Sequence, residues 1–460
     1  MVILGAARQG LALARWLAGH GARVVLSDRR SQAELAGARA GLQAPGIEWV
    51  LGGHPLELLD RADIVCLSGG VPTGLPIVQE AIRRGIPLSN DTQIFLEAAP
   101  CRTVGITGSA GKTTTTALVG RMASLAMDER AASAPAPEQT PRAYVGGNIG
   151  DPLISYVDAM QPGDLAILEV SSFQLEQMST SPNVAAVLNI TPNHLDRHGS
   201  MEAYTAAKSR LLAFQSPDDI AVLGREDAGA WALRDQVRGQ LQSFGFGRLE
   251  DGEGTYLDEG LLVLYERRVD IPLLRREQLQ LRGDHNVLNV LAAFAIGHAA
   301  GLPLGAMLAA AEDFRGVPHR LELVSSRDGV SWYNDSIATA PERTMAAIRS
   351  FDAPIVLLLG GRDKDLPWDG LARLVHERVD HVLLFGEAAG KIEQALQAET
   401  AARPFTLKRV SSLREAVQEA RAVAEPGDVV LLSPGGTSFD EFKDFEERGE
   451  KYRLWVQELP

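Results

Sequence analysis

The stretch from Thr103 to Val119 constrains the fold more than any other part of this sequence. It reads TVGITGSAGKTTTTALV, an apolar run followed by a glycine-containing turn, one lysine and four threonines. A strict Walker-type phosphate loop would have glycine at position 106, where this chain has isoleucine. The variant Gly108–Thr113 still has glycines that let backbone N–H groups surround an anion at the start of a helix. We therefore predict a strand, a phosphate loop and a helix, rather than a plain glycine turn.

Two side chains of this loop suit the phosphates of a nucleoside triphosphate. Lys112 can place a positive charge at the β- and γ-phosphates, and the Thr113 hydroxyl can ligate Mg²⁺. Further along, the stretch LAILEVSSFQLE puts Glu169 at the end of a predicted strand. A carboxylate at a strand end beside a phosphate loop is a candidate second metal contact.

Short β-branched and apolar runs alternate with stretches rich in alanine and leucine along most of the chain, as at Val2–Leu4, Val24–Leu26 and Ile64–Leu67. This alternation predicts βαβ units with parallel strands. A second such series begins at Thr103 and a third near Gly329. Met127–Arg142 is rich in alanine and proline, and we predict a surface loop or hairpin there. The length of 460 residues favours three α/β domains, which we predict over residues 1–99, 100–316 and 317–460.

Composition excludes several classes of partner. The net charge of −14, without a long basic run, argues against nucleic acid and against an anionic membrane surface. The two cysteines, Cys66 and Cys101, suit a reducing compartment. Because the chain shows no signal peptide and no apolar run of membrane-spanning length, we expect a soluble cytoplasmic protein. The triplet Asn189–Thr191 matches a glycosylation acceptor, which we interpret as a chance match.

The first βαβ unit is a candidate nucleotide site. Its turn Gly5–Gly10 reads GAARQG, so Ala7 replaces the glycine that lets backbone approach a pyrophosphate in dinucleotide sites. Asp28 ends the next predicted strand and Ser68 follows another, so both belong to the sheet edge where ligands bind. Two interpretations stay open: an ordinary βαβ unit with a tight turn, and a nucleotide site that differs from a standard NAD site.

A series of motifs occurs in the order of the Mur ligases and covers essentially the whole chain. The motifs are GSAGKTT, GGNIG, EVSSFQLE, NITPNHLDRH with AAKSRL, GDHNVLNVLAA, VPHRLE, NDSIATAP, LLLGGRDKD and LLSPGGTSFDEFKDFEERG. SSFQLE, GGRDK and SPGGTSFDEFKDFEERG most resemble the members that add D-glutamate to UDP-N-acetylmuramoyl-L-alanine (UDP-MurNAc-L-Ala). The resemblance implies a Rossmann-like UDP-binding domain, a central P-loop ATPase-like parallel-sheet domain and a C-terminal Rossmann-like domain.

The same resemblance implies an ATP-dependent carbon–nitrogen ligase of cytoplasmic peptidoglycan precursor synthesis, forming ADP and phosphate through an acyl phosphate. Its substrates would be UDP-MurNAc-L-Ala, D-Glu and ATP, and the protein would be a monomer with two Mg²⁺ ions. Taken singly, a histidine in NITPNHLDRH is usually structural and a helical lysine in AAKSRL is usually solvated. The resemblance instead gives catalytic roles to Lys112, Glu169, His194 and Lys208.

The resemblance also assigns ligands. CO₂ would carbamylate Lys208, because a carbamate offers oxygen ligands that suit Mg²⁺ better than an ammonium group. The metal ligands would be Thr113, Glu169, His194 and carbamylated Lys208. ATP would contact Gly108, Ser109, Gly111, Lys112, Thr113, Thr114, Asn289, Arg320 and Asp335. The UDP substrate would contact Asp28, Ser68, Asn148 and Ser171, and glutamate would contact Thr339, Lys364, Ser438 and Phe445.

The glutamate site has separate physical support. The stretch VVLLSPGGTSFDEF predicts a strand, a glycine loop and a helix, with Ser438 and Glu441 at capping-box spacing. Free N–H groups at that predicted helix start favour a carboxylate. Lys364 follows Gly360 and Gly361 at another predicted strand end and can pair with a second carboxylate.

Ile337 departs from the pattern Asp-Ser-Lys-Ala-Thr-Asn of the D-glutamate-adding members, because Asp335–Ala340 reads DSIATA. Either Arg320, Lys364 and Mg²⁺ supply enough positive charge, or the amino acid binds in another pose or handedness; we favour the first. A sister Mur-type or folate:polyglutamate ligase using another amino acid, L-Glu included, stays open. A P-loop switch or motor would instead bind a protein or nucleic acid, and Ala7 argues against an NAD-dependent dehydrogenase.

Overall fold

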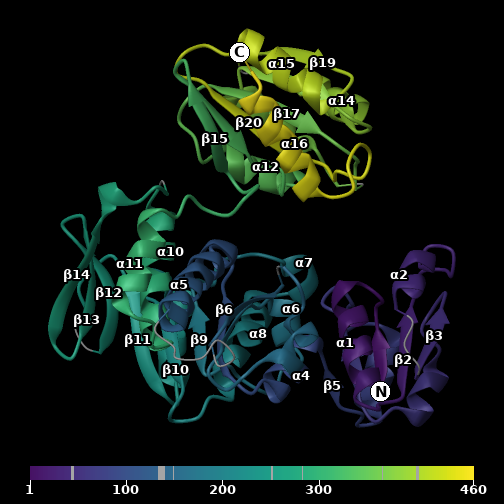
Figure 1. The fold of residues 1–460 in the computed structure, drawn as a ribbon. Coiled ribbons are helices and arrows are strands. Elements are labelled where there is room, and N and C mark those ends of the chain that lie inside the picture. The colour runs from purple at the N-terminus through teal and green to yellow at the C-terminus, as the bar shows by residue number, and fades with distance from the viewer. Residues whose placement is uncertain are drawn as a thin grey trace. The chain divides into compact units, whose positions relative to one another are not determined.

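The computed structural model describes residues 1–42, 46–132, 140–148, 150–249, 252–281, 283–364, 366–399 and 403–459. Their strands form three sheets, and the chain divides into two compact units, Met1–Phe314 and Arg315–Pro460 (Figure 1). The α/β fold with parallel sheets that the alternating pattern predicts is confirmed. Among the described residues, each helix is too short or too polar to span a membrane.

The first unit begins with a parallel five-stranded sheet in the order β3-β2-β1-β4-β5. Its strands are β1 (Val2–Leu4), β2 (Val24–Asp28), β3 (Ile47–Leu51), β4 (Val65–Leu67) and β5 (Leu88–Ser89). The helical segments are α1 (Arg8–Gly19), α2 (Ala36–Gly41), η1 (Leu56–Arg61), α3 (Pro76–Arg83) and α4 (Asp91–Ala98). The strand order reverses between β1 and β4, so the ligand crevice expected of such a sheet lies beyond Leu4 and Leu67.

The second sheet of this unit has nine strands in the order β14-β13-β12-β11-β10-β9-β6-β8-β7, with an antiparallel edge at β12-β13-β14. The strands are β6 (Arg102–Thr107), β7 (Ala143–Gly147), β8 (Leu165–Glu169), β9 (Val184–Val187), β10 (Ile220–Gly224), β11 (Gln240–Gly245), β12 (Glu253–Asp258), β13 (Leu261–Glu266) and β14 (Val269–Arg275). The helices are α5 (Lys112–Ala132), η3 (Leu153–Ser155), η4 (Val157–Ala159), α6 (Ser172–Leu175), α7 (Leu195–His198), α8 (Met201–Ala213), α9 (Ala228–Trp231), η5 (Ala232–Gln236), η6 (Arg276–Gln278), α10 (Asp284–Ala299) and α11 (Leu304–Glu312).

The second unit contains a six-stranded sheet in the order β15-β16-β20-β17-β18-β19, parallel except for the β15–β16 hairpin. Its strands are β15 (Glu322–Arg327), β16 (Val330–Asn334), β17 (Ile355–Gly360), β18 (His381–Phe385), β19 (Thr406–Arg409) and β20 (Val429–Gly435). Its helices are α12 (Pro341–Ile348), α13 (Asp369–Arg378), α14 (Ala389–Ala398), α15 (Leu413–Val423) and α16 (Phe445–Gln457).

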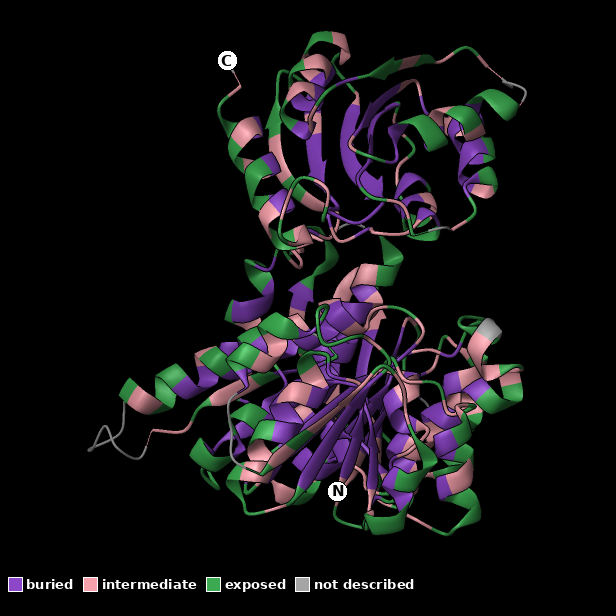
Figure 2. Cartoon of the chain, turned by 90° about the vertical axis from the view of Figure 1, so that its right-hand side faces the viewer, coloured by how far each residue is buried: buried purple, intermediate pink, exposed green. Residues whose placement is uncertain are grey.

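Burial follows the period of the strands and helices (Figure 2). In β17 every residue is buried, and alternate side chains enter different apolar clusters: Leu357 packs with α13 and α14, and Leu358 packs with α15 and α16. A central strand covered on both faces therefore reads as one apolar run. In the first unit, one apolar cluster joins the two sheets, because Phe95 of α4 and Leu153 of η3 belong to it.

Two local predictions need correction. Met127–Arg142 is not a loop throughout, because α5 continues to Ala132; residues 133–139 lie outside the described residues. Ser438 does not cap a helix: Ser438–Glu441 forms a turn, and α16 starts only at Phe445. There Asp444 accepts a hydrogen bond from the Glu447 N–H at 2.8 Å and caps α16 instead. The predicted domain boundaries at residues 99 and 316 stay predictions.

Candidate active site

The phosphate loop lies where the sequence predicts it, between β6 and α5. Lys112 Nζ donates to the carbonyl oxygens of Gly108 at 2.7 Å and Ser109 at 3.4 Å, so the ammonium group folds back over the loop. Gly111 has φ of 83°, in the left-handed region that glycine adopts readily. A Cβ at this position would lie 2.2 Å from Asn289 Oδ1, so close approach also requires glycine. The loop and the start of α5 thus form a backbone cradle with one cation above it.

Asn289, predicted to contact ATP, lies directly against this loop. It comes from α10 and is buried, and its side-chain amide donates to Asn286 Oδ1 at 3.1 Å. The fold therefore brings the polar side chain of Asn289 next to Gly111, although the two residues lie more than a hundred positions apart in the sequence. Nothing in the local sequence of α10 indicates that proximity.

Sequence reasoning missed the residues that hold the phosphate loop in place through hydrogen bonds. Asn189 Oδ1 accepts from the Ala110 N–H at 2.8 Å, and its carbonyl oxygen accepts from the Ser109 N–H at 3.0 Å. The Ser109 hydroxyl donates to the Thr191 carbonyl oxygen at 2.9 Å and lies 3.0 Å from the Tyr204 hydroxyl. The triplet that resembled a glycosylation acceptor is thus part of the loop's scaffold. Its position directly after an apolar strand was the available signal.

Lys208 is fully buried, at 1% exposure, which excludes the solvated helix face that is usual for a single lysine. Its Nζ donates to Thr107 Oγ1 at 3.3 Å and lies 4.7 Å from the centre of the Tyr204 ring. Burial, and after it the charge of Lys112, lower the pKa of Lys208 to about 6. The amine is therefore mostly neutral at neutral pH, and a neutral amine is a nucleophile.

Glu169 lies at the sheet edge beside the phosphate loop, because β8 pairs with β6 and places Glu169 opposite Ile106. It is 2% exposed, and its Oε1 accepts from Asn148 Nδ2 at 2.8 Å. Among the described residues, nothing hydrogen-bonds its buried Oε2. An unsatisfied buried carboxylate oxygen is costly without a further partner, and a cation is a fitting one.

This set of donors suits Mg²⁺ bound together with phosphates. Glu169 Oε2 and the Thr113 hydroxyl are oxygen donors, the type that Mg²⁺ prefers. Within the described part of the chain, no three His, Cys, Asp or Glu side chains converge as a metal cage. Mg²⁺ usually keeps several waters and takes one or two protein carboxylates plus substrate phosphates, so such a sparse set fits it.

The EVSSFQLE and NITPNHLDRH motifs contact each other through aromatic rings. His194 has φ of 52°, an uncommon value for a residue other than glycine, and its ring lies 5.1 Å from that of Phe173. Arg197 lies over the same Phe173 ring at 3.8 Å. Ser171 caps α6, accepting from the Gln174 N–H at 3.3 Å. Two predicted site stretches, more than twenty residues apart, are therefore neighbours.

Asp28 and Ser68 lie at the carboxyl edge of the five-stranded sheet. Asp28 accepts from the Ala6 N–H at 2.7 Å and from the Arg30 guanidinium at 2.8 Å and 3.0 Å. Burial raises the pKa of the Asp28 carboxyl, but these hydrogen bonds outweigh it and hold the pKa well below its usual range. Ser68 Oγ donates to the Gly5 carbonyl oxygen at 3.2 Å. Both side chains thus brace the turn between β1 and α1.

In the second unit, the residues predicted to bind the glutamate substrate lie in segments that follow β16, β17 and β20. Lys364 Nζ donates to Thr339 Oγ1 at 3.2 Å, and Ser438 is buried. The Phe445 carbonyl oxygen accepts from the Ser336 hydroxyl at 2.8 Å. Sequence reasoning missed Arg448, which is fully buried and donates to Ser336 and to the Gly436 carbonyl oxygen. Its position in the α16 motif gave no sign of that burial.

Known protein families match three parts of this chain. The model of the Mur ligase middle domain matches residues 106–297, that of the Mur ligase glutamate ligase domain matches 319–436, and that of the MurD-like N-terminal domain matches 1–90. The chain belongs to the Mur ligase family. A UDP-N-acetylmuramoylalanine–D-glutamate ligase of Symbiobacterium thermophilum is 40% identical over 459 residues, covering 99% of this chain and 97% of the relative. One of Anaeromyxobacter dehalogenans is 41% identical over 473 residues, covering 100% and 97%.

Solved structures of Mur ligases share the fold at low sequence identity. The UDP-N-acetylmuramate–alanine ligase MurC of Thermotoga maritima has a TM-score of 0.54 and 19% identity, covering 99% of each chain. A MurF structure from Acinetobacter baumannii has a TM-score of 0.56 and 18% identity, covering 95% of this chain and 91% of that one. These two likenesses concern the fold alone.

Within this Mur ligase fold, the predicted site residues fall into the two units. The first unit holds Asp28, Ser68, Gly108, Ser109, Gly111, Lys112, Thr113, Thr114, Asn148, Glu169, Ser171, His194, Lys208 and Asn289. The second holds Arg320, Asp335, Thr339, Lys364, Ser438 and Phe445. The Arg320 N–H donates to the Val317 carbonyl oxygen at 3.2 Å. The assigned roles of all these residues stay predictions.

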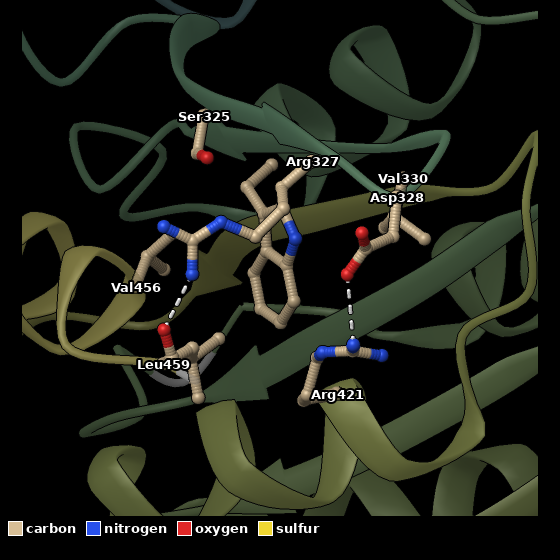
Figure 3. Close-up of a pocket in the computed structure, with 8 residues that line it drawn as sticks. Ser325, Arg327, Asp328, Val330, Arg421, Val456 and Leu459 are labelled. Atoms are coloured by element: carbon tan, nitrogen blue, oxygen red, sulfur yellow. Dashed lines mark hydrogen bonds and ion pairs between the residues drawn. The ribbon is translucent and has the colours of Figure 1, made fainter.

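A small pocket of the second unit belongs to its internal packing (Figure 3). Arg421 Nη2 donates to Asp328 Oδ2 at 2.9 Å, and Arg327 Nη1 donates to the Leu459 carbonyl oxygen at 2.5 Å. Trp332 also lines the pocket. These contacts tie the β15–β16 hairpin of the Mur ligase C-terminal unit to α15 and to the end of the chain.

Asp335 makes the stability of the second unit depend on pH. It is 5% exposed and accepts from Ser433 Oγ at 2.8 Å and from the Leu321 N–H at 3.2 Å. Burial raises the pKa of Asp335 from 3.8 to about 7. The folded state therefore holds a proton that the unfolded chain has released, so this stability is complete below pH 3.8 and is lost as the pH rises through about 7.

We expect Asp335→Asn to flatten this pH dependence, because an amide cannot ionise in the buried site. The wild-type free energy of unfolding should fall between about pH 4 and pH 7 by more than that of the variant, by on the order of a few kcal/mol. Urea unfolding of both proteins across this range measures the difference. Parallel pH curves for the two proteins would contradict the prediction.

Proposed function

We propose that this protein joins D-glutamate to UDP-MurNAc-L-Ala in an ATP-dependent reaction that forms ADP and phosphate. The observation that carries the proposal is a buried lysine, Lys208, beside the phosphate loop of Lys112, in a chain that matches D-glutamate ligases over its full length. The proposal includes three domains at residues 1–99, 100–316 and 317–460, and a monomeric protein. It also includes a cytoplasmic location, where ATP and UDP-linked precursors are available.

In the first step, the terminal phosphoryl group of ATP moves to the carboxylate of the alanyl group, forming an acyl phosphate and ADP. Such a transfer between anions depends on positioning and charge neutralisation rather than on covalent help. Lys112 and the backbone N–H groups of residues 108–111 would bind the phosphates. Asn289 would hold the loop and touch ATP, with Arg320 and Asp335 at the nucleoside.

Thr113, Glu169, His194 and carbamylated Lys208 would hold two Mg²⁺ ions in this proposal. The unsatisfied Oε2 of Glu169 supports a cation there. When bound, Mg²⁺ neutralises phosphate charge and helps to align the reacting oxygens. Asn148 would keep the Glu169 carboxylate oriented through its hydrogen bond of 2.8 Å.

The environment of Lys208 supports its carbamylation by CO₂. The neutral amine would attack the carbon of CO₂, a nitrogen–carbon bond would form, and one proton would pass to water. The product is an anion with two oxygens, which restores charge balance beside Lys112. The hydrogen bond from Lys208 to Thr107 holds the amine at the end of β6, next to the phosphate loop.

In the second step, the amine of D-glutamate attacks the acyl phosphate carbon, a tetrahedral intermediate forms, and phosphate leaves to give the amide. Thr339, Lys364, Ser438 and Phe445 would bind the glutamate carboxylates. The UDP part of the substrate would occupy the crevice beyond β1 and β4, near Asp28 and Ser68, and Asn148 and Ser171 would contact the same substrate. The strand reversal between β1 and β4 supports that placement.

A sister ligase that uses another amino acid, such as L-Glu, is the second candidate. Ile337 favours it, because a branched alkyl side chain brings no charge to the segment before Thr339. We prefer D-glutamate, because Thr339, Lys364 and Ser438 are all present and Lys364 contacts Thr339.

Phosphate release tests the function directly. With ATP and UDP-MurNAc-L-Ala present, we expect release to depend on D-Glu and to be far slower with L-Glu. Ile337→Ala should change this stereopreference little, because the alkyl group carries no polar contact to either enantiomer. A wild-type preference for L-Glu, or for an uncharged amino acid, would overturn the D-glutamate assignment and leave an ATP-dependent amide ligase.

A further inference from the structure

Two cations of the second unit are attached to one short segment, residues 337–339. Arg343 Nη1 donates to the Ile337 carbonyl oxygen at 3.4 Å, and Lys364 Nζ donates to Thr339 Oγ1 at 3.2 Å. The Thr339 N–H donates to the same Ile337 carbonyl oxygen at 2.9 Å, which closes the segment into a tight turn. The first turn of α12 and the loop after β17 therefore direct their positive charges to one place.

Neither cation has a carboxylate within 4.0 Å among the residues that the structure describes, although both are exposed. Two other exposed arginines of this unit do have one: Arg362 pairs with Glu387 at 2.8 Å, and Arg421 pairs with Asp328 at 2.9 Å. A third cation, Arg448, lies beneath the same segment and donates to Ser336, which precedes Ile337. In an acidic protein, such a cluster is a site for an anion.

The cations also affect one another. Lys364 is exposed but partly covered by its neighbours, and this partial loss of hydration, then the charge of Arg343 and then that of Arg448, lower the pKa of Lys364. The folded unit therefore keeps three like charges close together. The carboxylates of Asp440 and Glu441 act on Arg448, whereas Lys364 and Arg343 have no carboxylate within 4.0 Å among the described residues. An amino acid with two carboxylates would supply the missing negative charge, whereas a neutral amino acid would supply only one carboxylate.

We propose that Arg343 binds one carboxylate of the incoming glutamate while Lys364 binds the other, so that Arg343 determines the preference for a dicarboxylic amino acid. The inference rests on the proposed ligase function and adds a residue to its glutamate site. A guanidinium group can bind a carboxylate through two parallel N–H donors, which an ammonium group cannot do. The single long contact of Arg343 to a backbone carbonyl leaves its other N–H groups available for that purpose.

The test measures D-Glu-dependent phosphate release by wild type, Arg343→Ala, Arg343→Lys and the control Arg349→Ala. Arg349 follows the last residue of α12 and is exposed, so the control removes an equal charge from the same helix. We expect Arg343→Ala to raise the KM for D-Glu about 10- to 100-fold, with the KM for ATP unchanged. The KM of Arg343→Lys for D-Glu should lie between those of wild type and Arg343→Ala. The discrimination between D-Glu and D-Gln should shrink in Arg343→Ala.

A KM for D-Glu within twofold of wild type in Arg343→Ala, with unchanged discrimination against D-Gln, would overturn the inference. A raised KM for ATP with an unchanged KM for D-Glu would overturn it too, because the cations would then serve the nucleotide. Wild-type protein without any amino-acid-dependent phosphate release would instead refute the proposed function. Thermal unfolding midpoints close to wild type, expected for an exposed residue, show that the variants are folded.

Discussion

Replacing Lys112 with alanine is expected to lower ATP-dependent ligation by at least about 10³-fold, because about 4 kcal/mol of transition-state stabilisation is lost with the cation. In the structure this ammonium group lies over the phosphate loop, 2.7 Å from the Gly108 carbonyl oxygen. The phosphates of ATP would take the place of that internal contact. Initial rates of ADP or phosphate formation at saturating substrates measure the loss.

The matched control for this variant is Lys408→Ala, which removes an exposed lysine that pairs with Glu419 at 2.6 Å. Its ligation rate should equal that of wild type. Lys112→Ala also loses its contacts to the loop carbonyls, so its thermal midpoint is measured alongside. A folded Lys112→Ala protein that retains ligation within tenfold of wild type would count decisively against the role assigned to the loop.

Lys208→Ala is expected to be nearly inactive, and a small carboxylate such as acetate should restore part of the activity. Substitution removes the amine that we propose to be carbamylated and leaves a cavity in which an added carboxylate can supply the missing oxygens. Ligation rates across a series of acetate concentrations measure the rescue. Near-normal turnover of Lys208→Ala without a response to acetate would contradict the carbamate.

Lys208→Met separates chemistry from packing in this experiment. Methionine retains most of the volume and length of the buried side chain but offers no amine, so it should be folded, inactive and insensitive to acetate. Wild-type protein incubated with ¹³C-bicarbonate should show a carbamate carbon signal that is absent from this variant. The same signal in both proteins would place the modification elsewhere.

Local patterns were sufficient for the elements that depend on neighbouring residues. Val2–Leu4 forms β1, and the alternation of apolar runs with helical stretches predicts the parallel α/β fold that the structure has. The phosphate loop was predictable because its glycines, lysine and threonine act through consecutive backbone positions. Local patterns failed at Ser438, whose capping-box spacing with Glu441 occurs in a turn while Asp444 caps the helix.

The surroundings of each candidate side chain were beyond local patterns. Lys208 resembled a solvated helical lysine in the sequence, yet the packing of α8 against β6 buries it beside Thr107. Asn189 resembled a glycosylation acceptor, yet it supports Ala110. The cluster of Arg343, Lys364 and Arg448 joins three elements that no sequence spacing connects.

The difference between the features that local patterns predict and those that they do not has a physical cause. Strand and helix periodicity, turns and phosphate loops result from interactions between residues a few positions apart, so the sequence by itself determined them here. The burial and the pKa of a side chain result from contacts across the sheets between residues far apart in the chain. The same contacts decide which side chains lie in one site. Only the tertiary structure decided, therefore, that Lys208 loses its hydration and that one oxygen of Glu169 has no hydrogen-bond partner among the described residues, because desolvation depends on everything that packs around a group.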